Sequence, residues 1–284
     1  MSRFTRFAAI DWSGARGYRH PGIALAVCDR GDAAPVLVEP PHRAWSRIEI
    51  LHWLLGHVSE PMLIGMDFSF APPLLDRGAY LPGEETATTA RGFWAYVDRV
   101  SDDVDLGAAG FLEARRGTHF YLGAVDGRKA DFMHFRRCEA RFNASGGGKA
   151  STVYDAIGAA QVAKASFAGM RLLHHIAGHI PIWPMDELPP DGAAIVEIYT
   201  AIAARATGLR KGRSKIRDGA ALDDALVALG SGRHAPLDRY TDHATDAILA
   251  AAWLRVNADR AALWSPPPLT SHLAATEGWT FGVV

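Results

Sequence analysis

The sequence predicts an α/β protein with a mixed β-sheet, and two observations lead to this prediction. Three short strand-like segments, residues 6–13, 22–29 and 35–39, are joined by glycine-containing turns, and turns this short favour antiparallel neighbours. A segment with helical apolar spacing follows at residues 48–58, and residues 61–70 (PMLIGMDFSF) are then almost continuously apolar. Such a run is typical of a strand that is buried on both faces in a parallel sheet.

The remaining elements follow from the same periodicities. Ser46 precedes the first helix and Glu49 lies three residues further on, which is the spacing of a capping box. The long middle segment, residues 71–190, is the least regular part of the chain. We expect helices at residues 90–100 and 161–176, a buried strand that begins the segment 193–202, helices at 220–229 and 241–257, and a final strand at 278–284.

Composition narrows the class of protein. The 284 residues are 49% hydrophobic and 21% charged, which is ordinary for a globular protein. The net charge is −1, whereas a protein that coats duplex nucleic acid usually carries a clear basic excess. The chain has no apolar run of about 18 residues, so we expect no membrane span. The short apolar run before Asp11 and the presence of only Cys28 and Cys138 predict a cytoplasmic protein without a disulfide framework.

Four acidic residues stand inside or at the end of apolar segments: Asp11, Asp67, Glu197 and Asp246. Ionised carboxylates are almost never fully buried unless they are paired or bound to metal. A single acid at a strand end commonly caps a helix or pairs with an arginine, but four such acids are harder to explain separately. If the first and fourth strands are neighbours, their two aspartates can lie side by side, and Mg²⁺ is the usual cation for such oxygen ligands. Two ions of this kind can promote phosphodiester cleavage.

The long helix near the C-terminus adds three polar candidates. Asp242, His243 and Asp246 point in directions of roughly 0°, 100° and 40° around a helix axis, so all three can face one site. Asp242 has another explanation, since an acid in the first turn complements the helix dipole. The residues that we expect to bind Mg²⁺ or Mn²⁺ are Asp11, Asp67, Glu197, Asp242 and Asp246.

The order of these residues resembles the ribonuclease H-like superfamily. The pattern His243-x-x-Asp246-Ala247 is similar to that of the Holliday-junction resolvase branch. The chain more closely resembles the predicted nuclease family catalogued as domain of unknown function 429. The matching segments are AIDWSGA (9–15), IGMDFSFAPP (64–73), GAAQVAKASFAGMRLL (158–173), IWPMDE (182–187), VEIY (196–199) and TDAILAAAWLR (245–255).

This resemblance implies a specific architecture. It implies one domain over residues 1–284, with a five-stranded sheet of order 3-2-1-4-5 flanked by helices. It makes residues 71–190 a large, mostly helical insertion between the fourth and fifth strands. It also places Asp11 on the central strand, Asp67 on the neighbouring strand and Asp246 on the closing helix.

The acids and the resemblance together predict a divalent-metal-dependent nuclease or other phosphodiesterase. The expected catalytic residues are Asp11, Asp67, Glu197, His243 and Asp246. Glu197 would add a metal ligand or position the attacking water, and His243 or Asp242 would orient that water or assist proton transfer. Two alternatives stay open. One is a nucleotide-phosphate enzyme of the actin and sugar-kinase type, whose first phosphate loop is loosely similar to residues 11–14, and the other is a non-catalytic RNase H-like binding module.

Basic residues outside the acidic set are candidates for contact with a phosphate backbone. Residues 113–149 carry eight Lys or Arg against four Asp or Glu, with aromatic residues interleaved. A second basic cluster lies within residues 205–217. The first segment could equally be a helical cap with internal ion pairs, and the second a solvated loop. The residues expected to contact a nucleic acid or another phosphodiester are Ser13, Arg115, Arg116, Lys149, Lys211 and Arg213.

Overall fold

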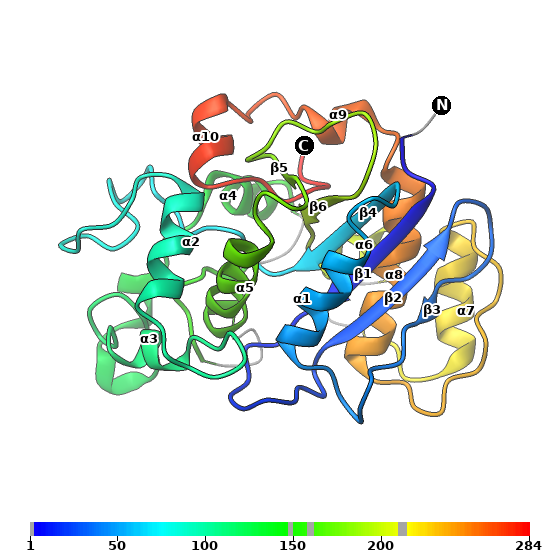
Figure 1. Ribbon diagram of the computed structural model, residues 1–284, viewed down its shortest axis with the longest axis horizontal. Coiled ribbons are helices and arrows are strands. Elements are labelled where there is room, and N and C mark those ends of the chain that lie inside the picture. The colour runs from blue at the N-terminus through cyan, green and yellow to red at the C-terminus, as the bar shows by residue number, and fades with distance from the viewer. Residues whose placement is uncertain (1–2, 147–149, 158–161, 210–214) are drawn as a thin grey trace.

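A six-stranded β-sheet lies at the centre of the protein in a computed structural model that describes residues 3–146, 150–157, 162–209 and 215–284. The strand order is β3-β2-β1-β4-β6-β5 (Figure 1). β1 is antiparallel to β2 and parallel to β4, and β4 is parallel to β6. The sheet is therefore mixed, as the sequence predicts. The strands are β1 (Arg6–Asp11), β2 (Ala24–Asp29), β3 (Val36–Leu37), β4 (Met62–Asp67), β5 (Ile182–Trp183) and β6 (Ala194–Glu197).

The sheet differs from the prediction at one edge. Five strands in the order 3-2-1-4-5 were expected, and the strand that carries Glu197 does pair with β4. The additional strand, β5, lies on the outer side of β6, with Ile182 opposite Ile195. β5 comes from within the predicted insertion at residues 71–190, so this segment also contributes to the sheet. A strand of two residues is too short to give a periodic signal in the sequence.

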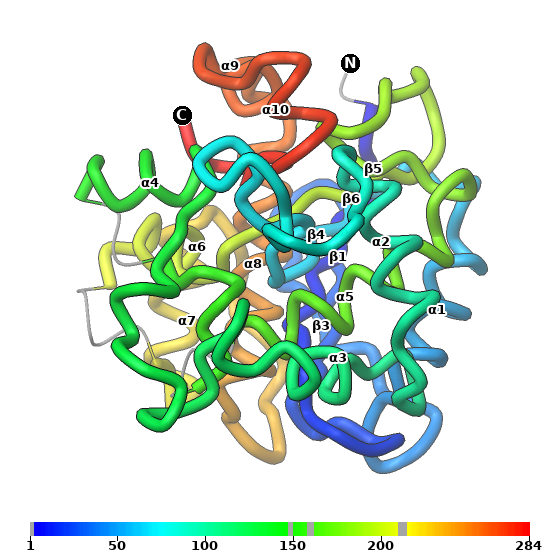
Figure 2. The backbone as a smooth tube through the Cα atoms, turned by 90° about the vertical axis from the view of Figure 1, so that its left-hand side faces the viewer, coloured from blue at the N-terminus to red at the C-terminus, as the bar shows by residue number. Residues whose placement is uncertain are grey.

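Helices cover both faces of the sheet, because successive strand residues point to opposite sides. In β1, Ala8 and Ile10 belong to one apolar core, whereas Phe7 and Ala9 belong to the other. Figure 2 shows the sheet between α1 and α5 on one side and α6, α7 and α8 on the other. These helices are α1 (Arg47–Gly56), α5 (Val162–Ile176), α6 (Thr200–Ala206), α7 (Gly219–Ala228) and α8 (Asp242–Asn257).

The prediction of a mostly helical insertion at residues 71–190 is wrong, because most described residues between β4 and β6 lie in loops and turns. The expected helix at residues 90–100 is present as α2 (Ala90–Arg99), which packs against α5. Both α2 and α3 extend to one side of the sheet (Figure 1). Four short helical elements of this segment had no sustained period by which to predict them. They are α3 (Ala109–Glu113), α4 (Arg137–Ala144) and two 3-10 helices, η1 (Ala124–Asp126) and η2 (Lys129–Phe132).

The prediction of a final strand at residues 278–284 is wrong. Thr280 makes only an isolated bridge to Glu197. Gly278 and Gly282 have positive φ angles of 67° and 106°, which interrupt an extended backbone. The apolar residues that led to this prediction are nevertheless buried, as Phe281 is. The helices before this segment are α9 (Ala261–Trp264) and α10 (Ser271–Thr276).

α1 begins at the predicted capping box. The Ser46 hydroxyl accepts a hydrogen bond from the Glu49 N–H at 3.0 Å, and the Glu49 carboxylate accepts one from the Ser46 N–H at 2.8 Å. This reciprocal pair satisfies donors that a helix N-terminus otherwise leaves free. The start of α1 is therefore fixed by local sequence.

Both cysteines are free thiols in the protein interior. Burial raises the pKa of Cys28 to about 11 and that of Cys138 to about 12. Neither side chain is therefore a reactive thiolate near neutral pH. In the described ranges, no helix combines the length and the apolar character that crossing a bilayer requires.

Candidate active site

Two aspartates lie opposite each other where β1 and β4 end. Asp11 and Asp67 are partners in the parallel register of these strands, and neighbouring strands lie roughly 4.8 Å apart. Asp11 is buried and Asp67 is half-buried. Thr200, the first residue of α6, donates from Oγ1 to Asp67 Oδ2 at 3.0 Å. The structure thus brings together the two acids that the sequence predicts on neighbouring strands.

α8 brings further polar residues to the same edge of the sheet. Thr241 caps this helix, since its hydroxyl accepts a hydrogen bond from the Ala244 N–H at 3.2 Å. The apolar residues of α8 pack against β1 and β2. As a result His243 Nδ1 lies 2.5 Å from Asp11 Oδ2. The carboxylate fixes the orientation of the imidazole, which remains 46% exposed.

The second nitrogen of His243 lies near Ser13. A Cβ atom added at Gly22 would lie 3.3 Å from His243 Nε2 and 3.3 Å from Ser13 Oγ. The glycine therefore leaves space next to both atoms, and a larger side chain would displace one of them. Ser13 and His243 line the same cavity.

Electrostatic repulsion among the aspartates shifts their protonation. Burial, followed by repulsion from Asp11, raises the pKa of Asp67 well above its usual range. The same two causes raise the pKa of Asp246 to about 7. Burial also raises the pKa of Asp11, although the hydrogen bond and the charge of His243 oppose this shift. Buried acids that repel one another in this way are frequent at functional sites.

A cavity of about 460 Å³ opens at Asp11 and Asp67. One wall is the first turn of α5, and another is α4. The segment after α10 closes a third side. Asp242 and Asp246 do not line the cavity. Its lining includes Asp11, Trp12, Ser13, Asp67, Phe68, Cys138, Glu139, Phe142, Lys164, Ala165, Glu197, Tyr199, His243, Thr280 and Val283.

Glu197 occupies a different environment from the aspartates. Its carboxylate accepts hydrogen bonds from both terminal nitrogens of Arg136, at 2.5 and 2.7 Å. It also accepts from the Phe70 N–H at 2.8 Å and from Thr280 Oγ1 at 2.5 Å. Arg136 Nε binds Glu139 as well, at 2.8 Å. Both oxygens of Glu197 are therefore engaged in a buried ion pair with an arginine that the sequence analysis did not single out.

Asp242 is paired with basic residues rather than with the other acids. Arg217 Nη1 lies 2.6 Å from Asp242 Oδ1, and Lys215 Nζ binds Oδ2 of the same carboxylate. Asp242 is also the acidic residue in the first turn of α8, where it complements the helix dipole. Two of the predicted basic residues of this segment, Lys211 and Arg213, lie outside the described residues.

The other predicted basic contacts lie away from the cavity lining. Arg115 Nη2 donates to Glu84 Oε2 at 2.9 Å, and Arg116 Nε donates to Asp126 Oδ1 at 2.7 Å. Arg115 also lies over the Phe111 ring. These ion pairs within the chain agree with the second interpretation of residues 113–149, a helical cap with internal ion pairs. Lys149 lies outside the described residues.

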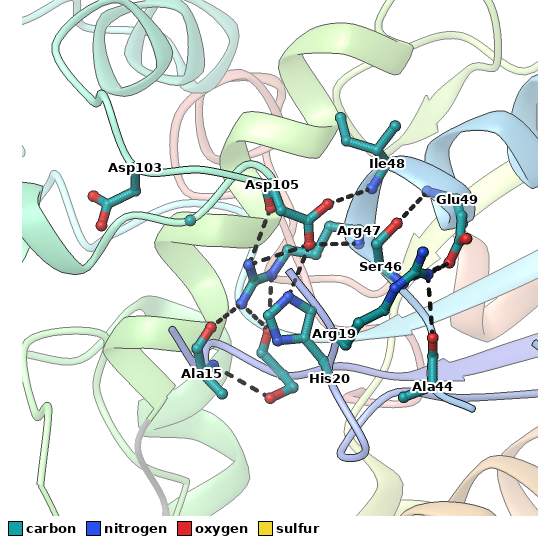
Figure 3. A network of polar contacts seen from close by, with 12 residues as sticks. Ala15, Arg19, His20, Ala44, Ser46, Arg47, Ile48, Glu49, Asp103 and Asp105 are labelled. Carbon is teal, nitrogen blue, oxygen red and sulfur yellow. Dashed lines mark hydrogen bonds and ion pairs between the residues drawn. The ribbon is translucent and has the colours of Figure 1, made fainter. Parts of the chain in front are cut away.

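A buried arginine that the sequence analysis missed holds the loop after β1. Arg47 Nε donates to the Ser13 carbonyl at 3.0 Å, and Nη2 donates to the Ala15 carbonyl at 2.6 Å (Figure 3). Asp105 accepts from the Arg47 N–H at 2.9 Å and lies 2.8 Å from His20 Nε2. A sequence signal did exist, because an arginine in the first turn of a helix opposes the helix dipole unless it has another partner.

Asp105 achieves this contact with an unusual backbone. Its φ is 51°, and that of Leu106 is 55°. Two successive non-glycine residues in the left-handed region cost free energy, and such strain persists only where the surroundings hold it in place. Here the Asp105 carboxylate binds the N–H groups of Arg47 and Ile48 at the start of α1. The strained residue Asp105 therefore holds Arg47, which in turn binds the loop that contains Ser13.

The oxygen donors fit a hard divalent cation in chemistry and in charge. Asp11, Asp67 and Asp246 offer carboxylates, and burial together with repulsion from Asp11 raises the pKa of both other acids. Over residues 3–146, 150–157, 162–209 and 215–284, no group of three or more His, Cys, Asp or Glu side chains is placed so that it could hold a metal ion. The donors are thus neighbours without forming a finished coordination sphere.

Neither a family model nor a curated protein nor a solved structure matches this chain. The function can therefore be inferred only from the residues of the site. These can offer carboxylates to a cation, hold a proton at an oriented imidazole and enclose a ligand of moderate size.

Proposed function

We propose that this protein is a divalent-metal-dependent phosphodiester hydrolase of the RNase H-like type that cleaves nucleic acid. The observation that carries the proposal is the register of Asp11 opposite Asp67 at the ends of two parallel strands. Burial and repulsion from Asp11 also raise the pKa of Asp246. This electrostatic arrangement favours a bound cation, which would relieve the repulsion. The proposal agrees with the function expected from the sequence resemblance to the family catalogued as domain of unknown function 429, although no family model matches the chain.

Asp11 and Asp67 would hold Mg²⁺ or Mn²⁺, and Asp246 would join them once its carboxylate moves toward the cation. Bound cations of this kind lower the pKa of water and stabilise charge on the leaving oxygen. Thr200 orients the Asp67 carboxylate through its hydroxyl, at 3.0 Å. Both oxygens of Glu197 already accept hydrogen bonds from Arg136. We therefore assign Glu197 to the support of the cavity wall in preference to the role of metal ligand.

His243 is the residue that would hold or move a proton. Its Nδ1 is bound to Asp11, so Nε2 is the nitrogen available on the side of Ser13. The hydrogen bond to Asp11 raises the pKa of His243 above its usual value, so the imidazole holds a proton more readily near neutral pH and can donate it as well as take it up. Ser13 would contact the substrate, because it lines the cavity beside this nitrogen.

The test is cleavage of labelled single-stranded, duplex and branched DNA and RNA with Mg²⁺ or Mn²⁺. We expect cleavage that chelation abolishes and that Asp11→Asn reduces by at least about 10³-fold, because one acid serves both the cation and the histidine. Asp224→Asn is the matched control, since Asp224 is exposed on α7. Cleavage that survives Asp11→Asn unchanged would refute the proposal.

The two alternative functions give different results with the same preparation. A nucleotide-phosphate enzyme of the actin and sugar-kinase type would bind ATP in a calorimetric titration, and we expect no such binding. A non-catalytic module would bind nucleic acid without cleaving any substrate in the panel. Both measurements use the full chain and require no variant.

A further inference from the structure

The cavity beside the paired aspartates is small. Its volume is about 460 Å³, within the range of roughly 300–1,000 Å³ that small-molecule sites span. This is the size of a site for one small ligand such as a nucleotide, and it is too small to enclose a base-paired duplex.

The wall formed by α5 is held tightly against the loop after β1. A Cβ atom at Gly14 would lie 2.1 Å from the backbone carbon of Lys164, so only glycine permits this approach. Trp12 Nε1 donates to the Ala165 carbonyl at 3.1 Å and ties the same two segments together. On the other side of the loop, Arg47 binds the Ser13 carbonyl.

The opposite wall is held by the buried ions around Arg136. This side chain is 1% exposed and joins Glu197 at the end of β6 to Glu139 on α4. Arg136 also donates to the Glu277 carbonyl at 3.1 Å, which brings in the segment after α10. Breaking a buried ion pair is costly. The width of the cavity is therefore set by fixed contacts on both sides.

The lining suits a nucleotide better than a phosphate alone. Four aromatic residues, Trp12, Phe68, Phe142 and Tyr199, line it together with the acids. Aromatic side chains bind nucleobases by stacking without much dependence on sequence. The acids and a bound cation would receive the phosphodiester, and the apolar part would receive the base.

We propose that the cavity binds one unpaired nucleotide of a single-stranded nucleic acid, with its phosphodiester at Asp11 and Asp67. This inference rests on the proposed hydrolase function for the position of the phosphodiester. The unpaired nucleotide has two sources, the end of a strand and an internal position. The first experiment separates these sources.

Three DNA substrates of matched sequence separate them: a linear single strand, a circular single strand and a duplex closed by hairpins at both ends. We expect the closed stem to be cut at least about 100-fold more slowly than the linear strand, because a paired base must first be unstacked and extruded. Cleavage of the linear strand alone identifies a strand end, and cleavage of the circle as well identifies internal unpaired nucleotides. Equal rates on the stem of the closed duplex and on the linear strand would overturn the inference.

A binding measurement tests the cavity without cleavage. Ala165 lines the cavity on α5, so Ala165→Val and Ala165→Phe fill it progressively. With nucleoside 5′-monophosphates and Mg²⁺ in calorimetry, we expect the dissociation constant to rise at least about tenfold for the Phe variant and less for Val. Val227→Phe on α7 is the matched control, because Val227 is 61% exposed.

The two proposals fail in different ways. If no nucleic acid is cleaved but mononucleotide binding weakens along the Ala165 series, the hydrolase function is wrong and the nucleotide site stands. If Asp11→Asn abolishes cleavage while the Ala165 series, shown by thermal unfolding to be folded, binds nucleotides as the native protein does, the nucleotide site is wrong. Failure of the native protein to bind any nucleoside monophosphate would also overturn it.

Discussion

At the scale of single residues, the site is defined by carboxylates in unlike environments. Glu197 and Asp242 are each neutralised by arginine or lysine. By contrast, burial and then repulsion from Asp11 raise the pKa of Asp67 and Asp246. A carboxylate that is paired inside the protein contributes to the fold, whereas one that repels its neighbours is maintained at a cost in stability. This contrast separates the candidate metal ligands from the structural acids.

Asp246 should lower the stability of the metal-free protein at alkaline pH. Its folded-state pKa of about 7 lies above the usual value. The unfolded chain therefore releases this proton first as the pH rises, and stability falls between about pH 4 and 7 and stays low above pH 7. Asp246→Asn removes the penalty, so we expect the variant to be more stable by about 4 kcal/mol at pH 8 and by about 2 kcal/mol at pH 5. Thermal unfolding in EDTA at both pH values measures this difference.

Mg²⁺ provides the control for this prediction. Added cation should raise the Tm of the native protein at pH 8, because a ligand that binds only the folded state stabilises it. Asp246→Asn should gain less, and Asp224→Asn should behave like the native chain. A variant that is less stable than the native protein in EDTA at pH 8 would contradict the proposed electrostatic strain.

At the scale of elements, the loop after β1 depends on the start of α1. Arg47→Lys keeps the charge but loses the planar fork that reaches two carbonyl groups. We expect the free energy of unfolding to fall by about 2 kcal/mol, because buried acceptors lose their donors. Urea denaturation measures this change, with Arg43→Lys as the exposed control. A loss below about 0.5 kcal/mol would show that Arg47 does not support the loop.

The ion pairs of Arg136 join α4 to β6, and they lead to a second prediction at this scale. Arg136→Met leaves the buried carboxylates of Glu139 and Glu197 without their cation, and we expect a loss of about 3–5 kcal/mol. The double variant Arg136→Met with Glu197→Gln should recover part of this loss. Arg128→Met is the control, since that side chain is 85% exposed. Equal stability of the single and double variants in urea denaturation would argue against a coupled ion pair.

The sequence predicted the elements whose signal is local. The apolar runs of β1 and β4 and the capping box of Ser46 have patterns that short windows reveal, and the two strands are neighbours as expected. The partners of the buried charges could not be predicted in this way. Arg136 lies 61 positions from Glu197, and no local pattern encodes such a pairing. For the same reason the sequence does not distinguish Glu197 from the aspartates. All of them lie in apolar segments, and only the fold shows that Glu197 pairs with Arg136.

At the scale of the whole molecule, the protein is nearly neutral and its cavity is small. We therefore expect it to contact only a few nucleotides of a nucleic acid at one time. Several described arginines in the two basic segments form ion pairs within the chain, including Arg115 with Glu84 and Arg217 with Asp242. The net charge is −1. Among the described residues of these segments, few basic side chains therefore lack an acidic partner and remain to displace counterions from a phosphate backbone.

Binding of a single strand should consequently depend only weakly on salt. For single strands the slope of log K against log salt concentration is about −0.7 per phosphate contacted, so one or two contacts give a slope near −1. Anisotropy of a labelled oligonucleotide with the Asp11→Asn protein and Mg²⁺, over a series of KCl concentrations, measures the slope without cleavage. A slope of about −4 or steeper would mean that at least five phosphates are contacted. An extended basic surface would then replace the single-nucleotide cavity as the principal determinant of binding.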